Sequence, residues 1–258
     1  MSETTTAAGA SAGGGVPQVR RVGVGAPFAW LARGFADMRA TRFAGTFYGA
    51  LFAAMGLAIH TIYAVKWQLT MGLTAGFFLI GPFVCCGIYG LSRQRAAGER
   101  PSLAASLVCW RRNPAGIGFF AAIVTFAMIV WARVSVVIFA LFSTRDFPTL
   151  QGVIAQIFAF SNLPFVAAWF GVGFVFATLV FAISVVSVPM LLDRNSDTMM
   201  SIFASVRALW VNPGALYLWA ALIVAIIGAS LVFGMVALVI TAPLVGHATW
   251  HAYRDLVV

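Results

Sequence analysis

Charged side chains are scarce in this chain. Only 9% of its 258 residues are charged, and just 7 of them are Asp or Glu, whereas about a quarter of the residues of an ordinary soluble domain carry a charge. The chain is also 62% hydrophobic, with a mean hydropathy of +0.97. This composition excludes a soluble globular fold and predicts an all-α, polytopic membrane protein.

Cysteine and histidine are rare as well, with three residues of each type. Cys85 and Cys86 are adjacent and Cys109 stands apart, so the cysteines lack the spacing of a zinc site or a disulfide framework. No set of Ser, His and Asp suggests a catalytic triad. We therefore expect no enzyme activity, and the sequence assigns no catalytic residue.

Long uncharged runs are what the sequence has in abundance. About 20 apolar residues cross a hydrocarbon layer roughly 30 Å thick. One helix over the apolar part of residues 214–253 would be about 55 Å long. A helix of that length is too long for the bilayer even when tilted, so two spans fit better there. A single long helix is the alternative interpretation. The predicted spans are residues 43–64, 68–92, 115–142, 164–192, 214–231 and 234–253.

Arginine is distributed unevenly between the two sides of these spans. Thirteen arginines lie before the first span, in the even-numbered connections and in the tail, against Lys66 and Arg145 on the other side. Because Lys and Arg are retained in the cytoplasm, both termini are predicted to be cytoplasmic in a bacterial inner membrane, with anionic lipid headgroups as partners. The arginines form no continuous face, which argues against nucleic-acid binding.

A repeated pattern groups the spans into three hairpins. The segments 102–113 and 201–212 are amphipathic and end in Asn-Pro, and residues 30–42 form a diverged third copy. Proline ends one helix and starts the next, so each segment is expected to be an interfacial helix on the cytoplasmic side, leading into a span. The even-numbered spans share an internal proline: Pro82, Pro189 and Pro243. The competing interpretation is that Asn-Pro is a common helix boundary.

Two segments lie outside the hairpins. Residues 1–27 are mostly small residues and are predicted to be a disordered cytoplasmic tail, so that the membrane domain covers residues 28–255. Residues 143–163 keep apolar residues at helical spacing and are expected to hold a short helix at the outer interface.

Several strings resemble a known family. Gly81-Pro82, the segment 87–93 and the closing segment 246–255 are similar to the bacterial predicted integral membrane proteins of domain of unknown function 2189, over about residues 30–258. The resemblance implies a membrane protein and adds no activity. Some members carry a loose label of cytochrome c oxidase subunit I, but His60 is predicted near the opposite end of the bilayer from His247 and His251, so these three cannot build one haem-copper centre.

Two histidines and one aspartate form the candidate metal site. His247 and His251 are spaced i and i+4, which puts both imidazoles on one helical face, and Asp255 follows one turn later. The other interpretation is an interfacial belt with Trp250 and Tyr253. These three residues alone do not assign a haem or metal cofactor.

Arg133 is the one charged residue inside a predicted span, and it is the candidate ligand- or lipid-binding residue. Burying a guanidinium in lipid costs a few kcal/mol or more. Arg133 either extends outward to lipid phosphate or lines a cavity for an anionic ligand or headgroup. No Asp or Glu lies inside a span to pair with it, which disfavours proton- or cation-coupled transport.

The functional prediction follows mainly by elimination. We expect a structural or accessory inner-membrane component that binds other membrane proteins or lipid. The alternative is a transporter or channel for a small solute, an anion or a lipid, with Arg133 on a polar path. A haem- or metal-binding redox subunit is the third hypothesis.

Overall fold

The computed structural model describes residues 17–65, 67–142 and 163–258. Within these ranges every element is a helix, apart from an isolated bridge between Val19 and Val257. The helices are α1 (Ala26–Val65), α2 (Trp67–Ala96), α3 (Leu103–Leu107), a 3-10 helix (Cys109–Arg112), α4 (Pro114–Phe142), α6 (Leu163–Ser184), α7 (Ser187–Arg194), α8 (Thr198–Val211), α9 (Pro213–Val232) and α10 (Leu238–Leu256). Residues 143–162, for which a short interfacial helix is predicted, lie outside the described residues. Most of the predicted tail lies outside them as well.

Four segments of the described chain are long and apolar enough to cross a membrane. They lie in α1, in α4, in α6 continued by α7, and in α9. The chain is therefore an all-helical membrane protein with several apolar helices, as its composition predicts.

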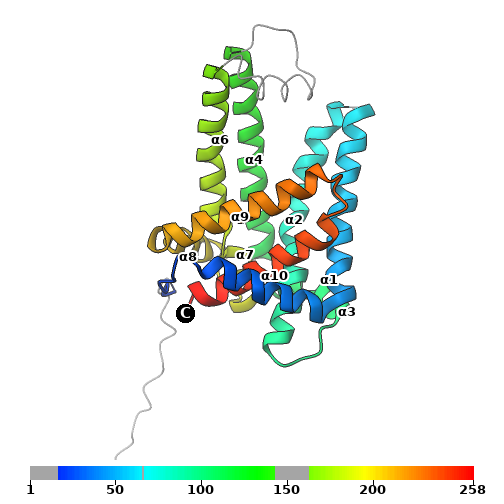
Figure 1. Cartoon of the computed structure of the whole chain (residues 1–258), viewed down its shortest axis with the longest axis vertical. Coiled ribbons are helices and arrows are strands. Elements are labelled where there is room, and N and C mark those ends of the chain that lie inside the picture. The colour runs from blue at the N-terminus through cyan, green and yellow to red at the C-terminus, as the bar shows by residue number, and fades with distance from the viewer. Residues whose placement is uncertain (1–16, 66, 143–162) are drawn as a thin grey trace, which may run out of the picture.

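The predicted boundary between an interfacial helix and the first span is present at Arg42. Helix α1 contains both segments, but the backbone of Arg42 leaves helical geometry with φ 29° and ψ −101°. The helix bends at this residue, so residues 26–41 run in a different direction from residues 43–65 (Figure 1). The amphipathic first part and the apolar second part thus follow different paths, as the sequence indicated.

Both Asn-Pro pairs begin long helices. Pro114 is the first residue of α4 and Pro213 is the first residue of α9. Proline suits this position because its fixed φ is helical and the first N–H of a helix has no partner anyway. The side chain of Asn113 accepts a hydrogen bond from Gly116 N at 3.0 Å, and Asn212 instead contacts the segment before α1, accepting from Val22 N at 2.8 Å.

The fourth predicted span, residues 164–192, is present as one candidate membrane-crossing segment, Leu163–Arg194, which contains a break. Helix α6 ends at Ser184 and α7 begins at Ser187. Pro189 lies four residues after Val185, so it has no N–H to donate to the Val185 carbonyl and its ring collides with that carbonyl. The proline shared by the even-numbered spans therefore bends this one.

The last apolar stretch forms two helices, so the single-helix alternative is wrong. Five residues, 233–237, separate α9 from α10, and Gly234 and Met235 adopt positive φ of 72° and 67°. Gly228 and Ser230, where the sequence also allowed a break, remain inside α9. The turn falls at Gly234 because glycine adopts positive φ without steric cost.

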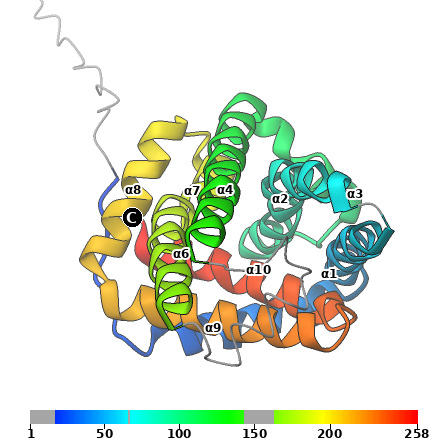
Figure 2. The same cartoon turned by 90° about the horizontal axis from the view of Figure 1, so that it is seen from above.

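The long helices form two sets that cross each other. The second part of α1 pairs with α2, and α4 pairs with α6, all running roughly along the long axis of the molecule (Figure 1). Helices α9 and α10 lie across this direction in both views (Figure 2). The two ends of the described chain meet, because Arg20 N donates to Leu256 O at 2.8 Å and Val258 N donates to Gln18 O at 3.0 Å.

Helix α10 packs against α1 through glycines. A Cβ atom added at Gly34 would lie 2.6 Å from Ala248 N, and one added at Gly49 would lie 2.0 Å from Val239 O. Small residues allow helix backbones to approach in membranes, where the hydrophobic effect does not drive helices together. This close contact fixes α10 beside both parts of α1.

Gly49→Ala is expected to lower the thermal stability of the purified protein in detergent. The added methyl group would meet the Val239 backbone, and such overpacking costs about 1–3 kcal/mol. Gly228→Ala is the matched control, because a Cβ at Gly228 meets nothing within 4 Å. Equal melting temperatures for the two variants would contradict the close α1–α10 contact.

Candidate functional site

A buried polar cluster joins α1, α2 and α10 at the arginine-rich end. Its centre is Asp37 on α1, whose carboxylate receives a hydrogen bond from Ser92 Oγ on α2 at 2.6 Å. The same carboxylate lies 3.1 Å from His251 Nε2 on α10 and forms an ion pair with Arg95 on α2. One carboxylate therefore connects three helices that are far apart in the sequence.

His247 extends this cluster toward Thr41. Its Nδ1 lies 2.7 Å from Ser92 Oγ, and its Nε2 lies 3.2 Å from Thr41 Oγ1. Because the Ser92 proton is directed to Asp37, the His247 Nδ1 donates to Ser92, which leaves Nε2 to accept from Thr41. The result is a continuous chain of hydrogen bonds from Thr41 to Asp37.

The chemistry available to this chain of hydrogen bonds is limited by burial. Thr41, Ser92 and His247 are 5%, 1% and 0% exposed, and each polar atom already has a partner. A hydroxyl, an imidazole and a carboxylate in series are the parts of a nucleophilic site, but a substrate would need a route to the hydroxyl. The arrangement is suited to clamping helices, because a satisfied polar network rigidifies a packed interior.

The three predicted metal ligands are only partly brought together. His247 and His251 do share one face of α10, and both approach the Asp37 cluster. Asp255 faces α1 one turn further along, where its carboxylate accepts from Trp30 Nε1 at 2.8 Å and pairs with Arg33, so it is bound to other partners than the two histidines. Among the described residues, no group of three or more His, Cys, Asp or Glu side chains is arranged to hold a metal ion.

His60 is placed as the sequence predicted, far from the other histidines. It is exposed near the end of α1, whereas His247 contacts Thr41 just before the bend in the same helix. The intervening part of α1 is roughly 25 Å long. The three histidines therefore do not converge.

A second polar cluster surrounds Asp193 at the end of α7. Its carboxylate accepts from Arg93 Nε at 3.2 Å, from Tyr253 OH at 2.9 Å and from Arg254 at 3.4 Å. Arg194 donates to Tyr253 OH at 3.0 Å and also reaches the last two carbonyls of the chain. The C-terminal ends of α2, α7 and α10, each of which has an internal proline, thus meet around one aspartate.

Arg133 lies on the surface of α4. Its side chain is exposed and makes no hydrogen bond or ion pair with another described residue. It does not line the cavity found among the other helices. The position fits an arginine that reaches toward lipid phosphate, and it does not support a polar path through the protein.

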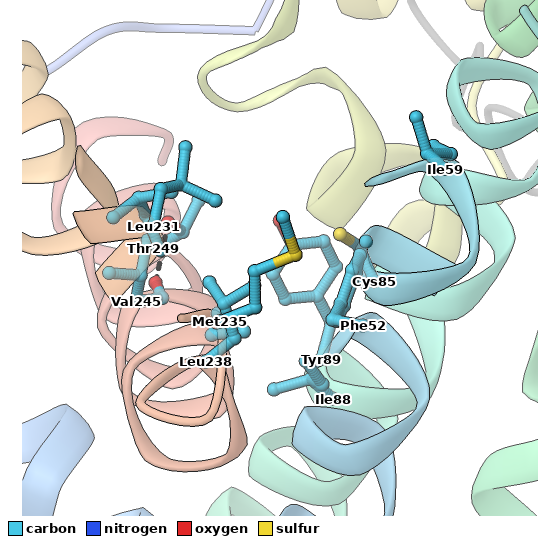
Figure 3. A pocket seen from close by; sticks show the side chains of 14 residues that line it. Phe52, Ile59, Cys85, Ile88, Tyr89, Leu231, Met235, Leu238, Val245 and Thr249 are labelled. Carbon is cyan, nitrogen blue, oxygen red and sulfur yellow. Dashed lines mark hydrogen bonds between the residues drawn. The ribbon is translucent and has the colours of Figure 1, made fainter. Parts of the chain in front are cut away.

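A cavity of about 470 Å³ lies between α1, α2, α9 and α10 (Figure 3). Of its fourteen lining residues only Tyr89, Thr249 and Cys85 carry a polar atom on the side chain, and the Thr249 hydroxyl donates back to Val245 O at 2.8 Å. Thr41, Ser92 and His247 do not line it. The cavity is therefore suited to an apolar ligand.

A match to a family model covers nearly half of the chain. Residues 69–193 match the model described as Predicted integral membrane protein (DUF2189). This segment is therefore similar to that family. The resemblance inferred from the sequence is confirmed over a shorter range than 30–258, and the closing segment 246–255 lies outside the matched residues. No curated protein and no solved structure matches the chain.

The family match includes one side of each polar cluster. Ser92, Arg93 and Arg95 lie within the matched segment, and so does Asp193. Their partners Asp37, His247, His251 and Tyr253 lie outside it. Sequence reasoning noted the two histidines but missed Asp37, because a lone acid on an amphipathic helix gives no signal about a partner more than 200 residues away.

Asp37→Asn is expected to destabilise the protein. The change removes the charge that Arg95 and His251 face, and hydrogen bonds to charged groups contribute about 1.5–3 kcal/mol each. The loss would appear as a lower melting temperature in detergent. Glu99→Gln is the control, because Glu99 is an exposed acid that forms no ion pair with a described residue. A melting temperature unchanged from the wild type would exclude the clamp role.

We expect the stability of the fold to depend on pH in the acid range because Arg33 pairs with Asp255. Asp255 lies outside the predicted spans. Burial pushes the pKa of the Asp255 carboxyl upward, but hydrogen bonds from Arg33 and Trp30 outweigh it and hold that pKa below its usual 3.8. A depressed pKa stabilises the fold at higher pH, and that contribution disappears as pH falls below about 3.8. Melting curves recorded between neutral pH and pH 3 should show it.

Arg33→Met should therefore flatten the acid-dependent loss of stability. Arg207→Met is the matched control, because Arg207 is exposed on α8 and pairs with no described residue. If both variants lose stability on acidification as steeply as the wild type, the Arg33–Asp255 pair does not contribute in this way.

Proposed function

We propose that the protein is a structural or accessory component of a bacterial inner membrane that works by holding lipid. The observation that carries this proposal is the apolar cavity between α1, α2, α9 and α10. A pocket with almost no polar side chain offers little to a solute, but it suits a lipid acyl chain. The proposed partners are membrane lipids, including anionic headgroups, and other membrane proteins, without a cofactor, an enzyme activity or nucleic acid.

The proposed topology places three hairpins in the bilayer, entering from the cytoplasmic side. The hairpins are α1 with α2, α4 with α6 and α7, and α9 with α10. Two observations support it: the ends of the described chain are hydrogen-bonded to each other, and thirteen arginines lie toward that side of the predicted spans. Residues 18–20 pair with the C-terminus, so the prediction of a disordered tail over all of residues 1–27 is wrong for that part of it.

We further propose that the hairpins are an internal repeat. The support is that α4 and α9 both begin at Asn-Pro, and that each returning helix carries an internal proline. The residues that end the returning helices, Arg93, Asp193 and Arg254, also meet at one point. Related units packed around a common axis bring equivalent ends together in this way.

Ala242→Phe is expected to reduce the lipid that copurifies with the protein in gentle detergent. Ala242 lines the cavity, and a phenyl ring there would take up space that an acyl chain needs. Native mass spectrometry of the purified protein, followed by extraction and identification of the bound lipid, measures the change.

Ala54→Phe serves as the matched control. It makes the same substitution at an exposed position of α1 that does not line the cavity. Equal lipid content in the two variants would refute the proposal that this cavity holds lipid, as would recovery of a polar solute in place of lipid.

A further inference from the structure

We infer that the α9–α10 hairpin turns inside the hydrocarbon layer and that the partner of its exposed apolar turn is the layer of lipid acyl chains. In this arrangement the hairpin enters the bilayer from the arginine-rich side and returns to it without reaching the far surface. Met235 of the turn borders the cavity, but the inference concerns the exposed side chains of Val232, Phe233 and Val236, which do not line it, and it does not depend on the proposed function.

The composition of the turn is the first observation. Residues 232–237 read Val-Phe-Gly-Met-Val-Ala and include no polar side chain. Val232, Phe233 and Val236 are nevertheless 83%, 75% and 74% exposed. The other two hairpins differ, because Lys66 lies between α1 and α2, and Arg145 and Asp146 lie between α4 and α6. Charged residues mark connections that reach water, and this connection has none.

Three of the five N–H groups in residues 233–237 are paired within the hairpin. Phe233 N donates to Ala229 O, Gly234 N to Leu231 O and Met235 N to Ser230 O, at 3.1–3.3 Å. Beyond the turn, Leu238, Val239 and Ile240 also donate to carbonyls within the segment. In lipid an unpaired N–H costs several kcal/mol, so a turn at membrane depth must pair its own backbone groups.

Two hydroxyls next to the turn are also paired with each other. Ser230 Oγ lies 2.7 Å from Thr241 Oγ1, so one hydroxyl donates to the other, and the hydroxyl that accepts donates to the carbonyl four residues earlier in its own segment. Ser230 is 1% exposed. The hairpin thus carries its own polar cross-link and leaves no hydroxyl facing lipid.

The inclination of the hairpin explains why its turn does not reach the far surface of the bilayer. Helix α9 has 20 residues, so it is roughly 30 Å long and would cross the hydrocarbon layer only if it stood upright. Both views show α9 and α10 inclined across α4 and α6, and the turn lies well short of the far ends of those helices (Figures 1 and 2). An inclined helix of this length ends within the bilayer.

The test places a single cysteine at Val236 in a full-length chain in which Cys85, Cys86 and Cys109 are replaced by Ala. A charged maleimide that does not cross membranes is added to sealed vesicles of both orientations. We expect Val236→Cys to react from neither side, at least about tenfold less than Glu99→Cys, because a charged reagent does not enter hydrocarbon.

A nitroxide attached to the same cysteine gives a positive readout. In the acyl-chain layer it should be relaxed strongly by molecular oxygen and only slightly by a water-soluble nickel chelate. Leu163→Cys at the start of α6 and Glu99→Cys at the arginine-rich end are the reference positions for the two membrane surfaces. If Val236→Cys does not fold, Phe233→Cys carries the same test, because it lies in the same exposed turn.

Three results would overturn the inference. Labelling of Val236→Cys from the side opposite Glu99→Cys would mean that the hairpin crosses completely. Labelling from the same side as Glu99→Cys would mean that the turn lies on the surface. A nitroxide reached by neither oxygen nor the chelate would mean that another protein covers the turn.

Discussion

The arrangement of α1, α2 and α10 depends on the hydrogen bonds and ion pairs of the Asp37 carboxylate. A single carboxylate on the bent helix α1 accepts from Ser92 and pairs with Arg95 and His251, so it ties α1 to both α2 and α10. Charges are rare in this chain, and an unpaired charge in a buried place is expensive. A carboxylate with three partners removes that cost and at the same time fixes how the helices meet.

The sequence predicted the local features of the fold because they depend on neighbouring residues. The bend at Arg42, the helix starts after Asn113 and Asn212, and the turn at Gly234 all follow from residues within one or two turns. The break before Pro189 belongs to the same class, because it follows from the proline inside that span. Proline, glycine and the change from amphipathic to apolar pattern act over short distances, so a single sequence shows them.

The contacts between distant segments could not be predicted from the sequence. His247 and His251 were predicted to share a face, and they do, but the carboxylate that His251 contacts is Asp37 and not Asp255, which lies one turn away on the same helix. Helical spacing says which side chains point the same way, and it says nothing about which helix they face. The inclination of α9 and α10 has the same origin, since it depends on the glycine contacts with α1 and not on the apolar length of either helix.

The inclination of the α9–α10 hairpin and the apolar cavity both result from the close packing of α10 against α1. Because Gly34 and Gly49 bring α10 against α1, the hairpin lies across the direction of the long helices. The cavity is lined by the second part of α1, by α2 and by the upper part of this hairpin, so it lies where the inclined helices diverge from the upright ones. Helices that cross at a large angle cannot fill the space between them with side chains alone. In a bilayer that space is available to acyl chains, which is the physical basis of the proposed binding of lipid.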